Sequence, residues 1–184
     1  MKQQYEQRVL ATKRRIYDAF VRLMQEKAIH QISISELCRL AGINRSTFYH
    51  HFGSQYDVLA ALTDDFLAEL EEKLQNVSPQ DQEGVQRRVA LCLSFAMENR
   101  ALTLLLMRNA VGTDFAQRLF SLPKIEMLLS EKLSDVESEA ERRARISFVT
   151  YGSYQLLQEW LNAPDPVGTK EETALILKLA RRIC

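Results

Sequence analysis

Residues 33–52, with the sequence SISELCRLAGINRSTFYHHF, constrain the fold of this chain more than any other segment. Ser33 opens a Ser-x-x-Glu capping box, which marks the start of a short helix. Gly42 stands where a helix is commonly ended by a residue in the left-handed conformation. Asn44 is then a good N-cap for a second helix. The segment predicts two short helices joined by a tight turn, at 34–41 and 45–51.

The second of these helices has two chemically different faces. Phe48 and Phe52 recur at helical spacing and predict the buried face. The opposite face carries a positive charge, hydroxyls, an aromatic ring and an imidazole, on Arg45, Ser46, Thr47, Tyr49 and His50. Such groups contact the phosphates and base edges of DNA. The pattern indicates a DNA-reading helix-turn-helix; a helical hairpin with a solvated polar face is the alternative.

The wider sequence resembles the TetR/AcrR family of bacterial transcriptional regulators. The resemblance is carried by RRIYDAFVRLM (14–24), ISISELCRLAGINRSTFYHHF (32–52) and the S-x-x-D-V-L segment that follows (54–59). It implies an all-α fold, with an N-terminal three-helix DNA-binding domain at 6–69 and a C-terminal dimerisation and regulatory domain at 70–184. It also implies a homodimeric regulator, expected to be a repressor, that binds a double-stranded DNA operator and is not an enzyme.

The predicted DNA contacts come from several parts of the N-terminal region. The resemblance implies that cations of the first helix contact the DNA backbone, and a solvated face is the alternative explanation for them. Family members usually carry Lys after Ser54, whereas this chain has Gln55, which removes one charge from the backbone clamp. We expect Thr47 and Tyr49 to contact phosphates. The full predicted set is Lys13, Arg14, Ser33, Arg45, Ser46, Thr47, Tyr49, His50 and Gln55, of which Arg45, Ser46 and His50 are the candidates for base edges.

The charge distribution agrees with this interpretation but would not establish it alone. Residues 1–55 hold nine Lys/Arg and four Asp/Glu, a balance of +5, whereas residues 56–184 have a balance of −5. This asymmetry favours docking of a polyanion at one end of the molecule. No apolar stretch approaches the ~20 residues of a membrane span, and the N-terminus has no signal-peptide core. We therefore expect a cytoplasmic protein with no membrane partner.

The sequence contains no pattern typical of a metal site, a cofactor or catalysis. Cys38, Cys92 and Cys184 are odd in number, widely spaced and without a C-x-x-C motif. We expect the first two to behave as small core hydrophobes, and a redox role is the alternative. No Ser/His/Asp or Cys/His arrangement and no phosphate-binding loop is suggested, so we expect no catalytic residue, no cofactor and no metal.

Helical periodicity and breaks predict the remaining elements. The first helix is expected at 6–27, and a later helix begins after Gly53 with Ser54 as its N-cap. The polar segment VSPQDQEG (77–84) is the clearest break in the chain. Beyond it, we expect helices at 85–97, 102–109, 113–133 (interrupted near Pro123), 146–161 and 171–183.

The last two predicted helices are apolar over most of their surface. Either helix 146–161 is the core of a single body, or the two helices form a dimer interface. The resemblance favours the interface, because in the TetR family the last two long helices form a four-helix bundle with their symmetry mates. A dimer also suits two DNA half-sites ~34–36 Å apart. The predicted interface residues are Tyr154, Leu157, Trp160, Leu161, Leu175 and Leu177.

A regulator of this kind needs a second site that responds to a signal, with the helix after Gly53 as its transmitter. Methionine and aromatic side chains suit an adaptable apolar cavity. Few charges besides Arg108 fall among them, so we expect a small apolar effector. A plain hydrophobic core, or a protein partner in place of a ligand, is the alternative. The candidate pocket walls are Phe95, Met97, Met107, Phe115, Phe148 and Tyr151.

Overall fold

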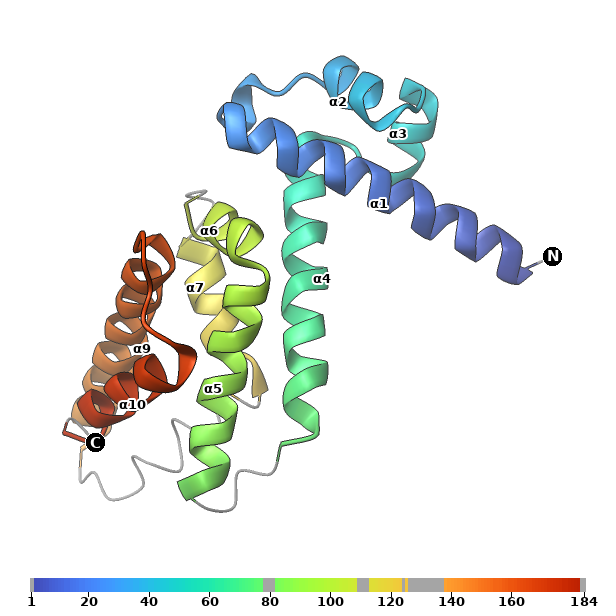
Figure 1. The fold of residues 1–184 in the computed structure, drawn as a ribbon. Helices are drawn as coiled ribbons and strands as arrows, with labels where there is room; N and C mark the ends of the chain where they lie inside the picture. Colours follow the sequence, from blue (N-terminus) through green and yellow to red (C-terminus); the bar gives the residue numbers. More distant parts are fainter. Residues whose placement is uncertain (1, 78–81, 109–112, 124, 126–137, 183–184) are drawn as a thin grey trace. The chain divides into compact units, whose positions relative to one another are not determined.

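A computed structural model of the protein describes residues 2–77, 82–108, 113–123, 125 and 138–182. Every regular element among these residues is a helix (Figure 1), so the predicted all-α fold is confirmed. The chain divides into two compact units, Met1–Phe66 and Leu67–Cys184. The division falls inside helix α4 (Gln55–Gln75).

The first unit contains the predicted helix-turn-helix. Its elements before α4 are α1 (Lys2–Glu26), the 3-10 turn η1 (Ile29–Gln31), α2 (Ile34–Ala41) and α3 (Arg45–His51). The predicted bounds of α2 and α3 are confirmed. Helix α1 begins before the predicted residue 6, and its first turns extend beyond α2 and α3 (Figure 1). Tyr5 and Leu10 on these turns are 60% and 65% exposed.

Local hydrogen bonds explain why α2 and α3 begin and end where they do. Ser33 Oγ accepts a hydrogen bond from the backbone N–H of Glu36 at 3.2 Å. Asn44 Oδ1 accepts one from the backbone N–H of Thr47 at 2.7 Å. Between the two helices, Gly42 has a φ of 63°, a left-handed conformation that a Cβ atom disfavours. The predicted caps at Ser33, Gly42 and Asn44 are confirmed.

Arg15 of α1 and Lys27, the residue directly after α1, hold α2 at its opposite ends. Lys27 Nζ lies 2.6 Å from the carboxylate of Glu36, in the first turn of α2. This hydrogen bond is the main cause that lowers the pKa of Glu36. At the other end, Arg15 Nη2 donates to the carbonyl oxygen of Gly42 at 2.5 Å. A guanidinium is well placed there, because the C-terminus of a helix carries a partial negative charge.

Apolar side chains from all four helices form the core of the first unit. Ile16, Phe20, Leu37, Phe48 and Val58 have no exposed surface. Burial of each such side chain contributes roughly 1.5–3 kcal/mol. This packing is essential, because helices of seven or eight residues are too short to be stable alone in water.

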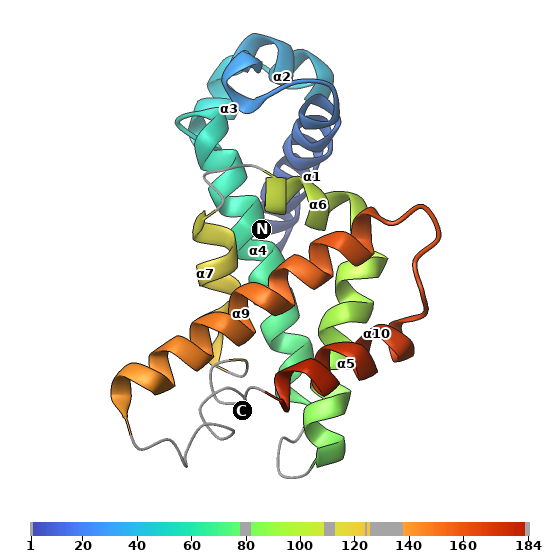
Figure 2. The same cartoon turned by 90° about the vertical axis from the view of Figure 1, so that its left-hand side faces the viewer.

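The second unit is built from the C-terminal part of α4 and a group of further helices. α9 and α10 lie side by side in it (Figure 2). α9 begins earlier than predicted, because the charged residues at its start continue the helix with an ion pair of 2.6 Å between Glu141 and Arg145. The described helices are α5 (Gln82–Glu98), α6 (Arg100–Arg108), α7 (Thr113–Phe120), α9 (Glu139–Asn162) and α10 (Thr169–Ala180). Residues 109, 124, 126–133 and 183 of the predicted helices lie outside the described residues.

The C-terminal end of α9 is fixed inside the second unit. Arg100 Nε donates to the carbonyl oxygen of Leu161 at 2.6 Å, and its Nη2 donates to that of Ala163 at 2.9 Å. Trp160 is 5% exposed and Leu161 is fully buried. The prediction that Trp160 and Leu161 form a subunit interface is therefore wrong, because their own unit already covers them.

Two of the predicted pocket walls lie on the surface of the second unit. Phe148 is 66% exposed and Tyr151 is 63% exposed, so neither encloses a pocket within the unit. The region, expected to hold few charges besides Arg108, also contains a buried arginine. Arg88 on α5 is 1% exposed, and its Nε donates to the carbonyl oxygen of Val77 at 2.8 Å.

The turn between α2 and α3 yields a first prediction. Gly42→Ala should lower the free energy of unfolding by roughly 1–2 kcal/mol, the cost of a left-handed alanine. A Cβ atom at this position would also lie 2.6 Å from Arg15 Nη2. Gly42→Asn is the matched control, because Asn tolerates the left-handed conformation better while bringing the same Cβ. In thermal denaturation, the melting temperature should be highest for the wild type, lower for Gly42→Asn and lowest for Gly42→Ala. An unchanged melting temperature of Gly42→Ala would contradict a turn that requires the left-handed conformation.

Candidate nucleic-acid interface

Helix α3 presents to solvent the face that the sequence predicts for DNA. Arg45, Ser46, Tyr49 and His50 are exposed and Thr47 is half-buried. Phe48, on the opposite face, is fully buried and its ring lies 5.9 Å from that of Phe52. Burial of Phe48 therefore fixes which side of α3 points outward. The face offers hydrogen-bond donors and acceptors on a rigid helix, as base and phosphate recognition requires.

The polar side chains of α3 also contact one another. Arg45 Nη2 donates to Tyr49 Oη at 3.5 Å, and the guanidinium carbon lies 6.0 Å from the centre of the Tyr49 ring. This contact raises the pKa of Arg45. Ser46 Oγ donates to Asn44 Oδ1 at 2.7 Å. Asn44, the N-cap of α3, thus holds the Ser46 side chain on the outer face as well as the backbone N–H of Thr47.

The three adjacent cations of α1 have different surroundings. Lys13 is half-buried and its Nζ lies 5.9 Å from the centre of the Phe52 ring. Arg14 is exposed. Arg15 donates to Gly42 and so supports the turn. Sequence reasoning missed this role of Arg15, because the three cations are consecutive and nothing local indicates which one reaches α2.

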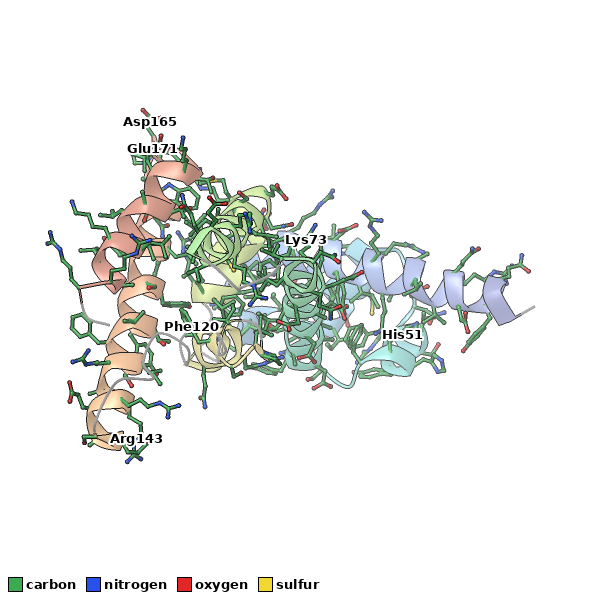
Figure 3. All side chains as sticks on the ribbon, turned by 90° about the horizontal axis from the view of Figure 1, so that it is seen from below. His51, Lys73, Phe120, Arg143, Asp165 and Glu171 are labelled. Atoms are coloured by element: carbon green, nitrogen blue, oxygen red, sulfur yellow. The ribbon has the colours of Figure 1, made fainter. Side chains whose placement is uncertain are left out.

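Lys13 also lies near the end of α3. Burial has the largest effect on the pKa of His51, which it lowers, and the charges of His50 and Lys13 lower this pKa further. The imidazole rings of His50 and His51 are 5.3 Å apart. Cationic and imidazole groups from α1 and α3 are therefore gathered in one region of the first unit. Sequence reasoning did not include His51, which the labelled view in Figure 3 places on α3.

Ser33 and Gln55 each lie at the start of a helix. Ser33 is exposed, but its hydroxyl oxygen caps α2 through the backbone N–H of Glu36. Gln55 is the half-buried first residue of α4. Helix N-termini offer free backbone N–H groups and a partial positive charge to phosphates. All of the predicted DNA contacts therefore fall within the first unit.

Other chemistry considered from the sequence has little support in the described part of the chain. Burial raises the pKa of Cys38 and raises that of Cys92 to about 12, so both thiols stay protonated at neutral pH. No group of three or more His, Cys, Asp and Glu among these residues is placed to hold a metal ion. No single described helix is long and apolar enough to cross a membrane; Glu83–Glu98 and Arg100–Arg108 reach that length only as a pair, bent by 93°.

Comparison with known proteins identifies the helix-turn-helix. Residues 16–62 match the family model of bacterial regulatory proteins of the tetR family. Residues 16–62 therefore form a helix-turn-helix domain of the TetR type. The comparisons support a DNA-binding transcriptional regulator that has this helix-turn-helix and a C-terminal helical domain.

Two relatives of this chain carry different descriptions. DhaS of Lactococcus lactis subsp. lactis (strain IL1403), the HTH-type dhaKLM operon transcriptional activator, is 35% identical over 91 residues. That match covers 50% of this chain and 46% of DhaS, so it spans less than half of that relative. AcrR of Shigella flexneri, an HTH-type transcriptional regulator, is 27% identical over 191 residues, covering 94% of this chain and 88% of AcrR.

Solved structures share the fold over nearly the whole chain. A TetR transcriptional regulator from Streptococcus agalactiae 2603V has a TM-score of 0.72 at 20% identity, covering 98% of this chain and 99% of that one. The dihydroxyacetone kinase operon activator DhaS has a TM-score of 0.60 at 23% identity, covering 92% and 93%. These likenesses concern the fold alone.

The contrast between two neighbouring arginines yields a second prediction. Arg14→Ala should reduce the salt dependence of DNA binding by about 0.9 in the slope of log K against log [salt], as expected when one phosphate is no longer neutralised, without changing thermal stability. Arg15→Ala should lower the free energy of unfolding by about 1 kcal/mol, because the Gly42 carbonyl loses its donor. Fluorescence anisotropy titrations of a random duplex between about 50 and 200 mM salt measure the salt dependence. Thermal melts measure stability, and together they separate the role of Arg14 from that of Arg15. Equal melting temperatures would contradict the role of Arg15.

Proposed function

We propose that this TetR-family regulator is a homodimer that binds a two-part DNA operator through α3 of each copy. The exposed face of α3 is the observation that carries the proposal. Its N-terminal residues Arg45 and Ser46 are candidates for base edges, because the N-terminal end of a recognition helix enters the major groove. Thr47 and the α1 cations Lys13 and Arg14, with Gln55, are candidates for phosphates.

The direct test uses double-stranded DNA from the region upstream of the protein's own gene. Purified protein should shift this DNA in the presence of excess unrelated competitor. The double variant Arg45→Ala/Tyr49→Ala should lose the shift while keeping the melting temperature of the wild type, because both side chains are exposed. An unchanged shift would mean that α3 does not read DNA in the proposed way.

An exposed apolar surface on the second unit supports the homodimer. Phe148 and Tyr151 on α9 are more than three-fifths exposed, and Leu175 and Leu179 on α10 are 43% and 37% exposed. A Cβ atom at Gly152 would meet nothing within 4 Å, so this part of α9 is open. Neighbouring exposed apolar side chains mark association surfaces. We propose that these residues form the interface together with the half-buried Tyr154, Leu157 and Leu177.

Charged residues bound the proposed interface along α9. Arg143 lies near the N-terminal end of the helix, and Asp165 follows its C-terminal end (Figure 3). Apolar side chains with charged ones on either side along the helix resemble the core and rim of a protein interface. A second copy is a suitable occupant, because a two-fold dimer provides two reading helices for two half-sites.

The proposed interface yields a third prediction. Phe148→Glu/Tyr151→Glu should convert the dimer into a folded monomer, because the change places charges in the interface while both positions are exposed in the single chain. The matched control is Tyr5→Glu/Leu10→Glu, an equally exposed aromatic and aliphatic pair on α1. Sedimentation velocity should show a monomer for the first variant and a dimer for the control. A dimeric Phe148→Glu/Tyr151→Glu protein would refute this interface.

A small apolar effector that releases DNA forms a further part of the proposal. Phe95, Met107 and Phe115 are buried in the second unit and Met97 is half-buried, so these four residues stay as candidate walls. Release requires that the effector favours the state that does not bind DNA, typically by about 1–3 kcal/mol. Thermal-shift screening of uncharged aromatic compounds, followed by measurement of DNA release, tests this part. Stabilisation without release would contradict it.

Activation is the second candidate for the direction of regulation. The description of the relative DhaS as an activator favours it, whereas an apolar effector that releases DNA favours repression. A co-activator would act through a protein partner rather than a small ligand. A reporter gene fused to the upstream region separates repression from activation. Deletion of the regulator gene raises reporter expression if the protein is a repressor and lowers it if the protein is an activator.

A further inference from the structure

The contact between Arg45 and Tyr49 stands out on the proposed DNA-reading face. The two residues are one helical turn apart on α3, and both are exposed. The guanidinium donates to Tyr49 Oη at 3.5 Å and lies 6.0 Å from the centre of the ring. The hydrogen bond is long, so attraction between the cation and the face of the ring also contributes. Tyr49 therefore restricts an arginine that would otherwise be free in solvent.

This restriction matters because of the conformational freedom that a long side chain gives up on binding. An exposed arginine has many rotamers, and fixing one of them reduces the affinity gained from its hydrogen bonds. A neighbour that restricts the side chain beforehand reduces that entropic cost. The benefit is greatest for a contact that needs a defined direction, such as a bidentate pair, and least for attraction to a phosphate charge.

Arg45 has enough remaining N–H donors to make a bidentate contact. A guanidinium has five N–H donors, and only one is used by Tyr49 Oη. In the major groove, guanine offers the two acceptors O6 and N7, which match two parallel N–H groups of arginine. Arg45 is also the first residue of α3, and this end of a recognition helix contacts base edges.

The neighbouring hydroxyl does not compete for the same base atoms. Ser46 Oγ already donates its proton to Asn44 Oδ1 at 2.7 Å. Towards DNA it therefore offers lone pairs alone, which match amino groups of adenine or cytosine and not the acceptors of guanine. In the first turn of α3, Arg45 is thus the donor suited to guanine.

We propose that Arg45 reads a guanine in each half-site and that Tyr49 is a positioning residue for this contact, so that the two side chains form one specificity-determining unit. This inference rests on the proposed function, because it requires that α3 reads DNA. It changes the sequence-based assignment of Tyr49, which was a phosphate contact. A phosphate contact affects all sequences alike, whereas a positioning residue affects the preference for guanine.

The test begins with selection of DNA from a randomised duplex library by the full-length wild-type protein. Each guanine in the enriched sequence is then replaced in turn by adenine and, separately, by 7-deazaguanine, which lacks only the N7 acceptor. The wild type should lose about 5- to 150-fold in affinity at one guanine per half-site, the range expected for a bidentate contact. Arg45→Ala should bind the guanine, adenine and 7-deazaguanine duplexes alike.

The Tyr49 variants then separate positioning from phosphate contact. Tyr49→Phe keeps the ring and should reduce the preference for guanine in part, and Tyr49→Ala should reduce it further. Thr47→Ala is the matched control on the same helix, because removing a hydroxyl that binds phosphate weakens binding to the guanine and adenine duplexes equally. Thermal melts of all variants exclude unfolding as the cause, because the substituted side chains of Arg45 and Tyr49 are exposed.

Each remaining outcome has a distinct meaning. If no sequence is enriched from the library, the proposed function itself fails. If a sequence is enriched but both Tyr49 variants keep the full preference for guanine, the positioning role is overturned and Tyr49 is a phosphate contact. If Arg45→Ala keeps every base preference of the wild type, the guanine assignment is overturned.

Discussion

The hydrogen bond between Arg15 and the carbonyl of Gly42 joins the longest helix of the first unit to the turn that precedes the proposed DNA-reading helix. Gly42 ends α2 in a left-handed conformation, and two residues later Asn44 begins α3. The direction of α3 is therefore decided at this turn, and a guanidinium from α1 satisfies the carbonyl at this point. Lys27, the residue after α1, fixes the other end of α2 through Glu36, so that both ends of α2 are tied to α1 or to the residue that follows it.

The shortness of α3 explains why a single helix serves two purposes. Seven residues make two turns, which is too short for an isolated helix. Burial of Phe48 against the core of the unit provides the missing stability, and the residues on either side of Phe48 then point outward. The same residue that anchors α3 thus sets the orientation of Arg45 and Tyr49. The side chains that stabilise α3 and those proposed to read DNA therefore lie on opposite faces of the helix, with little overlap between the two sets.

In the second unit, the apolar residues of α9 are divided between a buried end and an exposed part of the helix. The C-terminal end of α9 is enclosed in its own unit, where Arg100 satisfies the carbonyls of Leu161 and Ala163. Further toward its N-terminal end, Phe148 and Tyr151 remain exposed. One helix therefore supplies both a core and an apolar surface. The exposure of this surface to water in the described chain is the reason to expect association.

The sequence by itself determined the helix-turn-helix, because its signals are local. Ser33, Gly42 and Asn44 act on backbone groups within four residues of themselves, so their caps could be assigned from spacing alone. The two-faced pattern around Phe48 identified the outward residues of α3 in the same way. Periodicity was less informative for the C-terminal helices. It showed that α9 is apolar on most sides, but it could not distinguish the covered Trp160 and Leu161 from the exposed Phe148 and Tyr151.

Only the tertiary structure decided which of these side chains are covered, because coverage depends on neighbours that are distant in sequence. The same reason separates Arg14 from Arg15, which are adjacent in the chain but differ in whether Gly42 lies within reach. It also explains the burial of Arg88, whose guanidinium is held by a backbone carbonyl across the break between α4 and α5. Helix caps and turns depend on a few consecutive residues, whereas contacts between elements depend on how the whole chain packs.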